Sequence, residues 1–400
     1  MRNEQNPINL EQEISWLRSH LVDEVLVFWE KHALDSRGGI FTCIRDDGKI
    51  VSEDKWLWSQ WRAVWIFSMA WMKYGRRDKW LETAKGIADF CIAHGWTGDG
   101  WALRMNGNGE IQAGHDSFYV DCFAIYGLSA LFQATGEKKY LEWGNRTAEV
   151  MMKALALPQE QLPCWPYPVQ TGARVHGVAM MGAFNLFAQY QVSGDTRQLE
   201  WVKNLSDEIF EKFYCPERDV ILERRRADGG MLPGPAGSVI VPGHVIENMW
   251  FQIHIAQALG AGQEARILEC VRLIRRHLES GWDSEYGGLF LAIDADGGKE
   301  IGWAYADTKL WWPHTEALAA LAVSYQITGE SWCQEWYQKV KDYSLKTFYQ
   351  PEFGEWTQKR DRQGHALEEV VALPVKDPFH LPRGLMIAME AFTERYRYPE

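Results

Sequence analysis

The sequence has neither a long hydrophobic run nor a regular cysteine pattern. No apolar run approaches the roughly 18 residues of a membrane-spanning helix, and residues 1–13 lack the apolar stretch of a secretory signal. The seven cysteines are scattered, odd in number and without CxxC spacing, which favours reduced thiols over disulfides. We therefore expect a cytoplasmic protein that does not cross a membrane.

Positive charge is also scarce. Lys and Arg number 42 against 54 Asp and Glu, which gives a formal net charge of −12. Nucleic acids and anionic membrane surfaces bind basic surfaces, so we expect neither as a partner. Without an H-E-x-x-H motif or a cysteine cluster, we expect no metal site. Without a G-x-x-x-x-G-K-[ST] loop, we expect no cofactor, while a nucleotide activator stays open.

Aromatic residues, in contrast, are abundant, with 21 Trp, 15 Tyr and 17 Phe among 400 residues. At 46% hydrophobic content the chain can build a large core, and core packing accounts for most of these rings. Aromatic rings also stack on the C–H faces of sugars. Only aromatic residues that lie beside polar groups in loops therefore indicate a carbohydrate site.

A helical pattern repeats along the chain. Five segments share a Gly turn, a charged first helical turn and apolar residues at helical spacing: 74–90, 135–151, 193–209, 260–276 and 328–344. Residues 10–32 form a sixth copy without the leading turn. A more apolar helix follows each copy, and these helices are expected to begin near Lys55, Ser117, Arg174, Gly243, Lys309 and Phe379. Helices that are apolar all round lie inside a protein, whereas amphipathic helices lie outside.

Six alternating outer and inner helices predict an all-α (α/α)6 barrel, with an open superhelix as the main alternative. We expect one domain over residues 1–400. Turns from inner to outer helices are short, whereas the loops from outer to inner helices have roughly 20–30 residues and are expected to be functional. Several of these loops, such as residues 288–305, are expected to form small β-hairpins at the rim.

Polar residues recur where the inner helices begin. Because the inner helices run parallel, their amino-terminal ends and the long loops meet at one rim of the barrel. The polar residues expected there are Gln60, Arg62, Asp116, Asp121, His176, His244, Glu247, His314, Glu316, His380 and Arg383. This gathering predicts a site at the barrel mouth.

These residues also have structural interpretations. Arg62, among several Trp residues, is either the ion-pair partner of an inner-helix Glu or a ligand for a sugar oxygen. His244 and Glu247 form an H-x-x-E pair that fits two metal ligands, a histidine oriented by a carboxylate, or an incidental pair. His176 and His380 could each be a hydrogen-bonded structural histidine.

Histidines with an arginine and glutamates, without a metal or cofactor motif, suit proton transfer beside a carbonyl. A reducing sugar opened to its aldehyde has an acidic C2–H. Removal of this proton gives an enediolate, which an arginine and helix amino termini stabilise. Two histidines on opposite faces of the enediolate exchange base and acid roles and invert C2. The expected partner is a small-molecule reducing sugar.

Five segments resemble the N-acylglucosamine 2-epimerase family, which includes cellobiose 2-epimerases, mannose 2-epimerases and mannose isomerases. They are WSQWRAVWIFS, DSFYVDCFAIYGLSAL, VPGHVIENMWF, KLWWPHTEALAAL and PFHLPRGL, and the likeness covers essentially the whole chain. The resemblance implies an (α/α)6 barrel, in agreement with the repeat count, and it favours a homodimer. Some members use ATP as an activator.

The resemblance also implies roles for single residues. His244 and His380 match the two acid/base histidines. Glu247 matches the carboxylate beside the first of them, and Arg62 matches the arginine that holds the enediolate. The expected catalytic residues are therefore His244, His380, Glu247 and Arg62. The resemblance and the position at the rim together predict these substrate-binding residues: His176, Trp312, Glu316, Trp311, Asp116 and Arg383.

The leading hypothesis is a cofactor-independent sugar 2-epimerase that interconverts gluco- and manno-configured reducing sugars. N-acetylglucosamine/N-acetylmannosamine is the first substrate pair and D-glucose/D-mannose the second, because WWPH and FHLPR look closer to the N-acylglucosamine branch. One alternative is a mannose/fructose-type aldose–ketose isomerase, which uses the same enediolate. Others are an (α/α)6-barrel glycoside hydrolase with two catalytic carboxyl groups, and a non-catalytic sugar-binding protein.

Overall fold

Outer and inner helices alternate along the chain, as the repeat predicts. The structure is a computed structural model and describes residues 8–367 and 374–397. The first outer helix consists of α1 (Leu10–Ser19) and α2 (Leu26–His32), which the π-helical turn η1 (His20–Val25) joins. The other outer helices are α4 (Asp78–His94), α6 (Lys138–Leu155), α8 (Thr196–Glu208) with the π-helical η3 (Ile209–Phe213), α10 (Glu264–Gly281) and α12 (Ser331–Thr347).

The inner helices begin within two residues of the predicted positions. They are α3 (Leu57–Tyr74), α5 (Phe118–Thr135), α7 (His176–Ser193), α9 (Pro242–Leu259), α11 (Trp311–Thr328) and α13 (His380–Arg397). Each buries side chains on nearly all of its faces, which explains the absence of a polar stripe in these segments. At the end of α5, Gly136 adopts a φ of +70° and donates its backbone N–H to Phe132, so the chain turns at once into α6.

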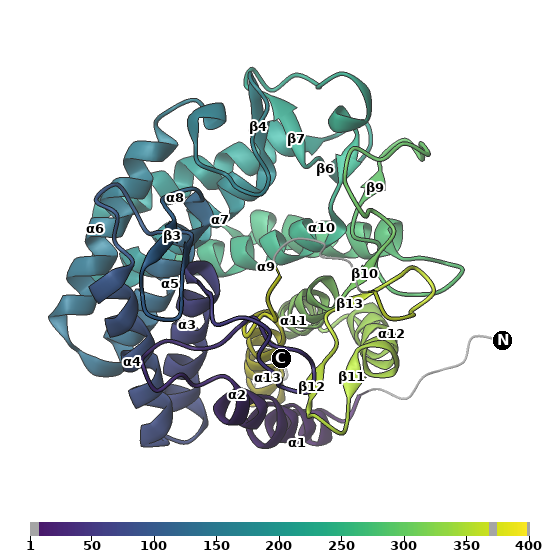
Figure 1. The fold of residues 1–400 in the computed structure, drawn as a ribbon. Coiled ribbons are helices and arrows are strands. Elements are labelled where there is room, and N and C mark those ends of the chain that lie inside the picture. The colour runs from purple at the N-terminus through teal and green to yellow at the C-terminus, as the bar shows by residue number, and fades with distance from the viewer. Residues whose placement is uncertain (1–7, 368–373, 398–400) are drawn as a thin grey trace.

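The helices close into a ring. Consecutive inner helices contact one another from α3 to α13, and the outer helices surround them (Figure 1). The last inner helix returns to the first, because Lys73 of α3 pairs with Glu390 of α13 at 2.6 Å. The structure is therefore an (α/α)6 barrel and not an open superhelix.

Short antiparallel strands connect neighbouring loops at one rim. Four strands directly precede inner helices and pair with strands of other loops: β1 (Lys55–Trp56) with β2 (Arg104–Met105), β4 (Ala173–Val175) with β7 (Arg224–Arg226), β8 (Val239–Ile240) with β9 (Ile293–Asp294), and β10 (Lys309–Leu310) with β13 (Lys359–Arg360). The remaining strands are β3 (Ile111–Ala113), which pairs with β2, β5 (Tyr214–Cys215) with β6 (Val220–Ile221), and β11 (Tyr349–Gln350) with β12 (Glu355–Trp356). Two short 3-10 turns, η2 (Gln159–Gln161) and η4 (Gly234–Gly237), complete the loops.

The expected hairpin within residues 288–305 is wrong. Ile293 and Asp294 form β9 and pair with β8, which lies immediately before α9. Trp303, expected on the second strand of the hairpin, instead stacks on Tyr167 at 5.3 Å between ring centroids. Stacking of this partly buried indole on another ring competes with local strand pairing, and β9 gains its backbone partners from another loop.

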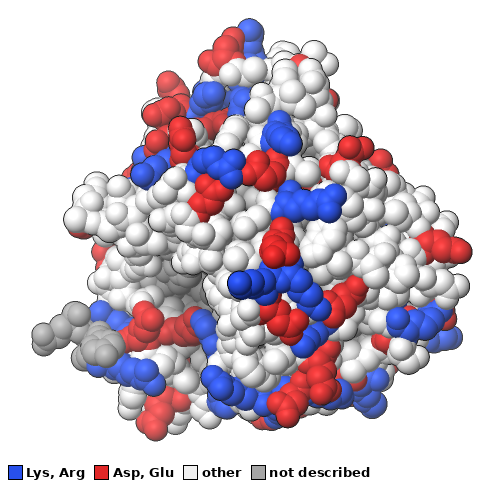
Figure 2. Space-filling view, turned by 90° about the vertical axis from the view of Figure 1, so that its left-hand side faces the viewer, with Lys and Arg blue, Asp and Glu red and all other residues white. Residues whose placement is uncertain are grey.

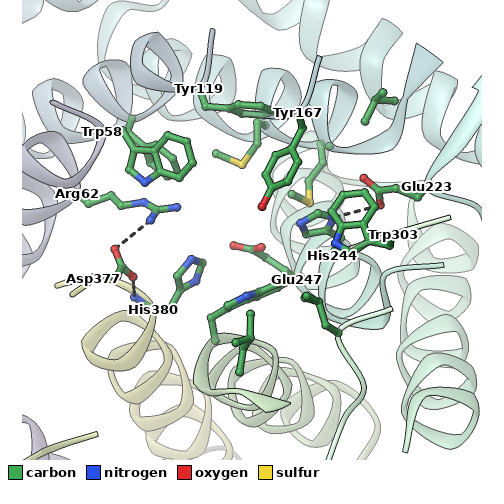
Figure 3. A pocket seen from close by; sticks show the side chains of 18 of the residues that line it. Trp58, Arg62, Tyr119, Tyr167, Glu223, His244, Glu247, Trp303, Asp377 and His380 are labelled. Carbon is green, nitrogen blue, oxygen red and sulfur yellow. Dashed lines mark hydrogen bonds and ion pairs between the residues drawn. The ribbon is translucent and has the colours of Figure 1, made fainter. Parts of the chain in front are cut away.

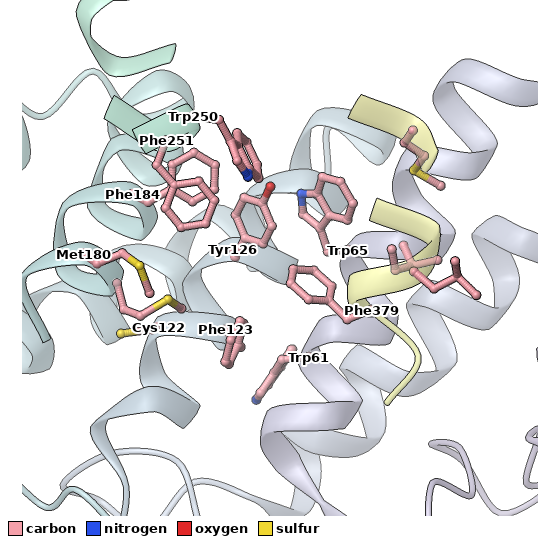
Figure 4. Packing of buried hydrophobic residues seen from close by; sticks show 14 of the residues in the cluster. Trp61, Trp65, Cys122, Phe123, Tyr126, Met180, Phe184, Trp250, Phe251 and Phe379 are labelled. Carbon is pink, nitrogen blue, oxygen red and sulfur yellow. The ribbon is translucent and has the colours of Figure 1, made fainter. Parts of the chain in front are cut away.

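An aromatic layer fills the barrel below the rim (Figure 4). The rings of Trp65 and Tyr126 stack with centroids 4.9 Å apart, and Phe184 stacks on Phe251 at 3.7 Å. Most buried hydrophobic residues belong to one cluster that includes this layer. The layer gives the loops and helix ends above it a rigid base.

Among residues 8–367 and 374–397, no helix combines the length and apolar character required to traverse a bilayer. On the face in Figure 2, Lys and Arg side chains are interspersed with Asp and Glu. Interspersed charges of both signs are typical of a solvated protein surface.

Candidate active site

A cavity opens at the rim where the inner helices begin. It is lined by Arg62, His244, Glu247 and His380, four of the sequence-predicted residues, together with both predicted tryptophans, Trp311 and Trp312. Figure 3 shows the two histidines on opposite sides of this cavity, with the carboxylate of Glu247 between them. The barrel thus brings together residues that are up to about 320 positions apart in the sequence.

The first histidine is held by a buried glutamate. His244 lies in the first turn of α9, and its Nδ1 is 3.0 Å from Oε2 of Glu223, which directly precedes β7. Burial alone would raise the pKa of Glu223, but the charges and hydrogen bonds of His244 and His176 lower it to about 2. Burial opposes protonation of His244, yet the Glu223 carboxylate raises the pKa of His244 above its ordinary value.

The second histidine has a matching partner. Nδ1 of His380 is 2.7 Å from Oε1 of Glu316, a fully buried residue of α11. Burial would raise the pKa of Glu316, but Arg383 and His380 lower it to about 2, so the carboxylate stays ionised. The backbone N–H of His380 donates to Asp377 at 3.1 Å, which fixes the start of α13. With Nδ1 occupied, each histidine has only Nε2 left for a ligand.

Arg62 lies against the same helix start. Its Nη1 donates to Oδ1 of Asp377 at 2.9 Å, and its guanidinium packs over Phe123 at 4.0 Å from the ring centroid. The predicted ion pair therefore exists, but its partner is an aspartate of the loop before α13. Figure 3 shows the guanidinium facing the cavity, so ion pairing and ligand binding are compatible roles.

Trp312 lies between the two histidine rings. Its ring centroid is 5.3 Å from that of His244 and 5.6 Å from that of His380. A flat apolar surface between two imidazoles suits the C–H face of a sugar.

A buried cation lies behind the histidines. Nη2 of Arg383 donates to Oε1 of both Glu247 and Glu316, the second contact at 2.6 Å. Ligand atoms of Glu247, Glu316 and His380 lie within 4.8 Å of one another, a spacing that could hold a metal ion. The Arg383 guanidinium already supplies positive charge to both carboxylates of this group, so the expectation of no metal stays a prediction with a physical basis.

Several sequence-predicted site residues lie outside the cavity lining. Asp116 is exposed and is not among the residues that line the cavity, and its assignment as a sugar ligand stays a prediction. His176, Glu316 and Arg383 are buried behind the lining and contact lining residues, so they support the site from behind. The role assignments of the remaining residues stay predictions.

Three other polar residues of the predicted rim have local structural partners. Oδ1 of Asp121 accepts the backbone N–H of Trp101 at 3.0 Å, and Gln60 bonds both backbone groups of Ile40. Nε2 of His314 accepts the N–H of Leu289 at 2.9 Å. These contacts give the three residues local structural roles.

Sequence reasoning missed several lining residues. Glu223 stands in a strand-like run, VILERRR, where a buried carboxylate looks the same as an exposed one. Asp377 had a detectable signal, because an Asp side chain near a helix start often accepts a backbone N–H a few residues later, as Asp377 does from His380. The aromatic lining residues that were missed are Trp58, Tyr119, Phe123, Tyr167 and Trp303.

The arrangement can move a proton on either side of a bound molecule. Each imidazole is anchored at Nδ1 by an ionised glutamate, and Arg62 and Glu247 line the same cavity. Fold and site together define a barrel protein suited to acid/base conversion of a small polar ring or chain such as a sugar.

Comparison with known proteins agrees with this class. Residues 39–381 match the family described as N-acylglucosamine 2-epimerase (GlcNAc 2-epimerase). An N-acylglucosamine 2-epimerase from Bos taurus is 30% identical over 390 residues, which cover 92% of this chain and 89% of that protein. A cellobiose 2-epimerase from Ruminococcus albus is 24% identical, with 95% and 98% covered. A crystal structure of D-mannose isomerase shares the fold, with a TM-score of 0.80, 17% identity and 96% and 100% coverage.

The chain belongs to the N-acylglucosamine 2-epimerase family. It is therefore an enzyme of the isomerase class.

Proposed function

We propose that the protein is a sugar 2-epimerase that interconverts N-acetylglucosamine and N-acetylmannosamine, with D-glucose and D-mannose as the second substrate pair. The observation that supports this most strongly is the pair of cavity histidines, each with Nδ1 bound to a buried glutamate at 3.0 or 2.7 Å. A single base would suffice to remove a proton, whereas inversion at carbon is simplest with one acid/base group on each face.

The reaction is a transfer of one proton off C2 and another onto it. In one direction, the neutral Nε2 of His244 takes the C2 proton of the open-chain aldehyde, and the electron pair moves to the carbonyl oxygen. The product is an enolate for the N-acetylated sugars and an enediolate for glucose and mannose. The protonated Nε2 of His380 then gives its proton to the other face of C2. In the reverse direction the two residues exchange roles, so the reaction needs no net uptake of protons.

Arg62 and Glu247 act on the oxygen atoms of the substrate. The Arg62 guanidinium lines the cavity and donates to the oxygen that gains charge in the enediolate. Glu247, held by Arg383, accepts a hydrogen bond from a sugar hydroxyl between the two histidines. The Arg62 interaction grows as charge develops on this oxygen, which lowers the barrier more than it tightens ground-state binding, whereas the Glu247 interaction orients the sugar.

The N-acylated pair is placed first for two reasons. A relative at 30% identity carries the name N-acylglucosamine 2-epimerase, and the cavity lining includes Phe123, Met180 and Met181. An acyl methyl group gains from an apolar surface, whereas a hydroxyl at C2 does not. The Met side chains adapt to groups of different length.

The test is a panel of reducing sugars with and without ATP, followed by NMR identification of each product. Conversion of N-acetylglucosamine to N-acetylmannosamine without added cofactor is the expected result. Formation of a ketose from mannose would instead favour the aldose–ketose isomerase, for which the D-mannose isomerase fold is the supporting observation. Release of reducing ends from glycosides would favour a hydrolase, and binding without turnover would favour a sugar-binding protein.

For the molecule in the cell we propose a cytoplasmic homodimer without nucleic-acid partners. All seven cysteines are unpaired and buried, which suits a reducing compartment. The net charge of −12 disfavours nucleic acid. The dimer rests on family resemblance, and sedimentation at micromolar concentration checks it: a single species near 46.1 kDa would exclude a dimer.

A further inference from the structure

A row of buried polar groups runs from α9 through α7 to the Glu223–His244 pair. It begins at Gln252, whose Nε2 donates to Oδ1 of Asn248 at 3.1 Å. Nδ2 of Asn248 lies 2.6 Å from Nε2 of His176. Nδ1 of His176 lies 3.8 Å from Oε2 of Glu223, the same oxygen that faces His244. His176 and Asn248 are both fully buried and do not line the cavity.

The row has a direction. Because Oδ1 of Asn248 accepts from Gln252, the group that Asn248 presents to His176 is its amide N–H. Nε2 of a neutral His176 therefore accepts, and the ring proton sits on Nδ1. That nitrogen is buried and makes no hydrogen bond within the described residues, and Oε2 of Glu223, 3.8 Å away, is the acceptor that its N–H faces.

Glu223 is thus shared between two imidazoles. Oε2 of its carboxylate lies 3.0 Å from Nδ1 of His244 and 3.8 Å from Nδ1 of His176, so it attracts the N–H groups of both rings. The N–H dipole of His176 partly offsets the negative charge of Glu223. The Glu223 carboxylate then raises the pKa of His244 by less. The pKa of His244 then depends on His176, a residue that does not contact the substrate.

We propose that His176 and Asn248 are positioning residues that set the proton affinity of His244 through Glu223. Asn248 fixes the tautomer of His176, and His176 partly neutralises Glu223, so that His244 can both take up and release a proton near neutral pH. This assigns His176 a role other than sugar binding. The link to turnover rests on the proposed epimerase function, whereas the link between the residues does not.

Other titratable groups near this pair do not replace His176. Those that face Glu223, His244 or His176 from the surrounding elements are Glu247 on α9, Arg224 on β7, His277 on α10, Tyr119 on α5 and Tyr167 in the loop before β4. Burial lowers the pKa of His277 to about 4 and raises the pKa of both tyrosines, so these three are neutral near pH 7. Arg224 and Glu247 are unchanged in every variant below.

Two substitutions should shift the pKa of His244 in opposite directions. His176→Phe removes the N–H that faces Glu223, so the pKa of His244 should rise by about 0.5 to 1. Asn248→Asp puts a carboxylate beside Nε2 of His176, which makes the ring an imidazolium, so the pKa of His244 should fall by about 0.5. Asn145→Asp is the matched control, because Oδ1 of Asn145 only accepts from Gln189, away from the site.

The measurement is a pH titration of 13C-labelled histidine side chains by NMR, with the His244 signal assigned from its absence in His244→Asn. Opposite shifts in His176→Phe and Asn248→Asp, with no shift in Asn145→Asp, are the expected result. A pKa of His244 that changes by less than about 0.2 in both variants, or in the same direction in both, would overturn the proposal. A merely structural role would lower the melting temperature without opposite pKa shifts.

The pH profile of kcat/KM gives the matching kinetic result. The profile should be bell-shaped. One of its two apparent pKa values should rise in His176→Phe and fall in Asn248→Asp, by the same amounts as the pKa measured by NMR. If the protein shows the NMR shifts but converts no sugar, the proposed function fails while the coupling stands. If it converts sugars and neither variant moves the pKa, the coupling fails while the function stands.

Discussion

Each of the two cavity histidines is expected to perform a proton transfer and not merely to bind. His244→Asn and His380→Asn should each lower kcat by at least about 10²-fold, the size typical of a lost general acid/base. KM should change much less, because Arg62 and Trp312 still hold the sugar. His94→Asn, an exposed residue of α4, is the control and should keep near-native kcat. Near-native kcat in both site variants would contradict the assignment.

Glu223 should affect stability in a defined pH window. It raises the pKa of His244 above 6.5 in the folded protein, so this contribution is full below pH 6.5 and is lost as the pH rises through the folded value. The pKa of Glu223 itself falls from 4.5 to about 2, so its contribution is present above pH 4.5 and is lost as the pH falls toward 2.

The protein should therefore lose most stability from Glu223→Gln between about pH 4.5 and 6.5. We expect a loss of about 1.5 to 3 kcal/mol there, the usual worth of a hydrogen bond to a charged group, and a smaller loss at pH 9. Urea unfolding at several pH values measures this difference. A difference that is constant from pH 5 to 9 would contradict the role of the ion pair.

At the scale of single residues, the sequence predicted which side chains lie at the rim, but not how deeply each is buried. His244, Glu247 and His380 follow from their place at helix starts, since the barrel directs those ends to one rim. Burial depth does not follow. Arg383 lies one helical turn after His380, and nothing in the sequence indicates that its guanidinium faces inward between two glutamates.

Among the elements, the inner helices approach one another closely at a glycine of α5. A Cβ on Gly127 would lie 2.6 Å from the backbone oxygen of Trp61 in α3, and backbone cannot move as a side-chain end can. Gly127→Ala is therefore expected to lower the free energy of unfolding by about 1 to 3 kcal/mol. Gly86→Ala in the outer helix α4 meets no atom within 4 Å and should raise it by about 0.5 to 1 kcal/mol.

Thermal or urea unfolding of both glycine variants checks this contrast between inner and outer helices. A Gly127→Ala protein as stable as the parent would mean that α3 and α5 are not packed as described. Because the glycine-to-alanine change is the same in both, the opposite signs separate packing from helix propensity.

Helices and local hairpins such as β5–β6 and β11–β12 were predictable, whereas strand pairing between loops was not, for a physical reason. An amphipathic or fully apolar helix has its period in its own residues, so the starts of α5 and α9 are visible locally. A two-residue strand such as β9 has its partner, β8, more than 50 positions away in another loop. Pairing across loops has no local signature, which is why residues 288–305 suggested a hairpin.

At the scale of the whole molecule, the repeat count predicted the closed barrel. Six pairs with short inner-to-outer turns leave little freedom, and the Lys73–Glu390 pair joins the ends of the ring. One domain over residues 1–400 stays a prediction, although most buried hydrophobic residues form one cluster. Residues 1–7, 368–373 and 398–400 lie outside the described residues.

The central claim is that two histidines on opposite faces of one planar enolate intermediate epimerise a sugar at C2. Epimerisation of N-acetylglucosamine in D₂O, stopped early and read by NMR, tests it most directly. The account predicts one solvent deuterium at C2 of the N-acetylmannosamine formed and almost none at C2 of the remaining substrate, because the group that takes the proton differs from the group that returns one. N-acetylmannosamine that keeps the original C2 proton would contradict the account.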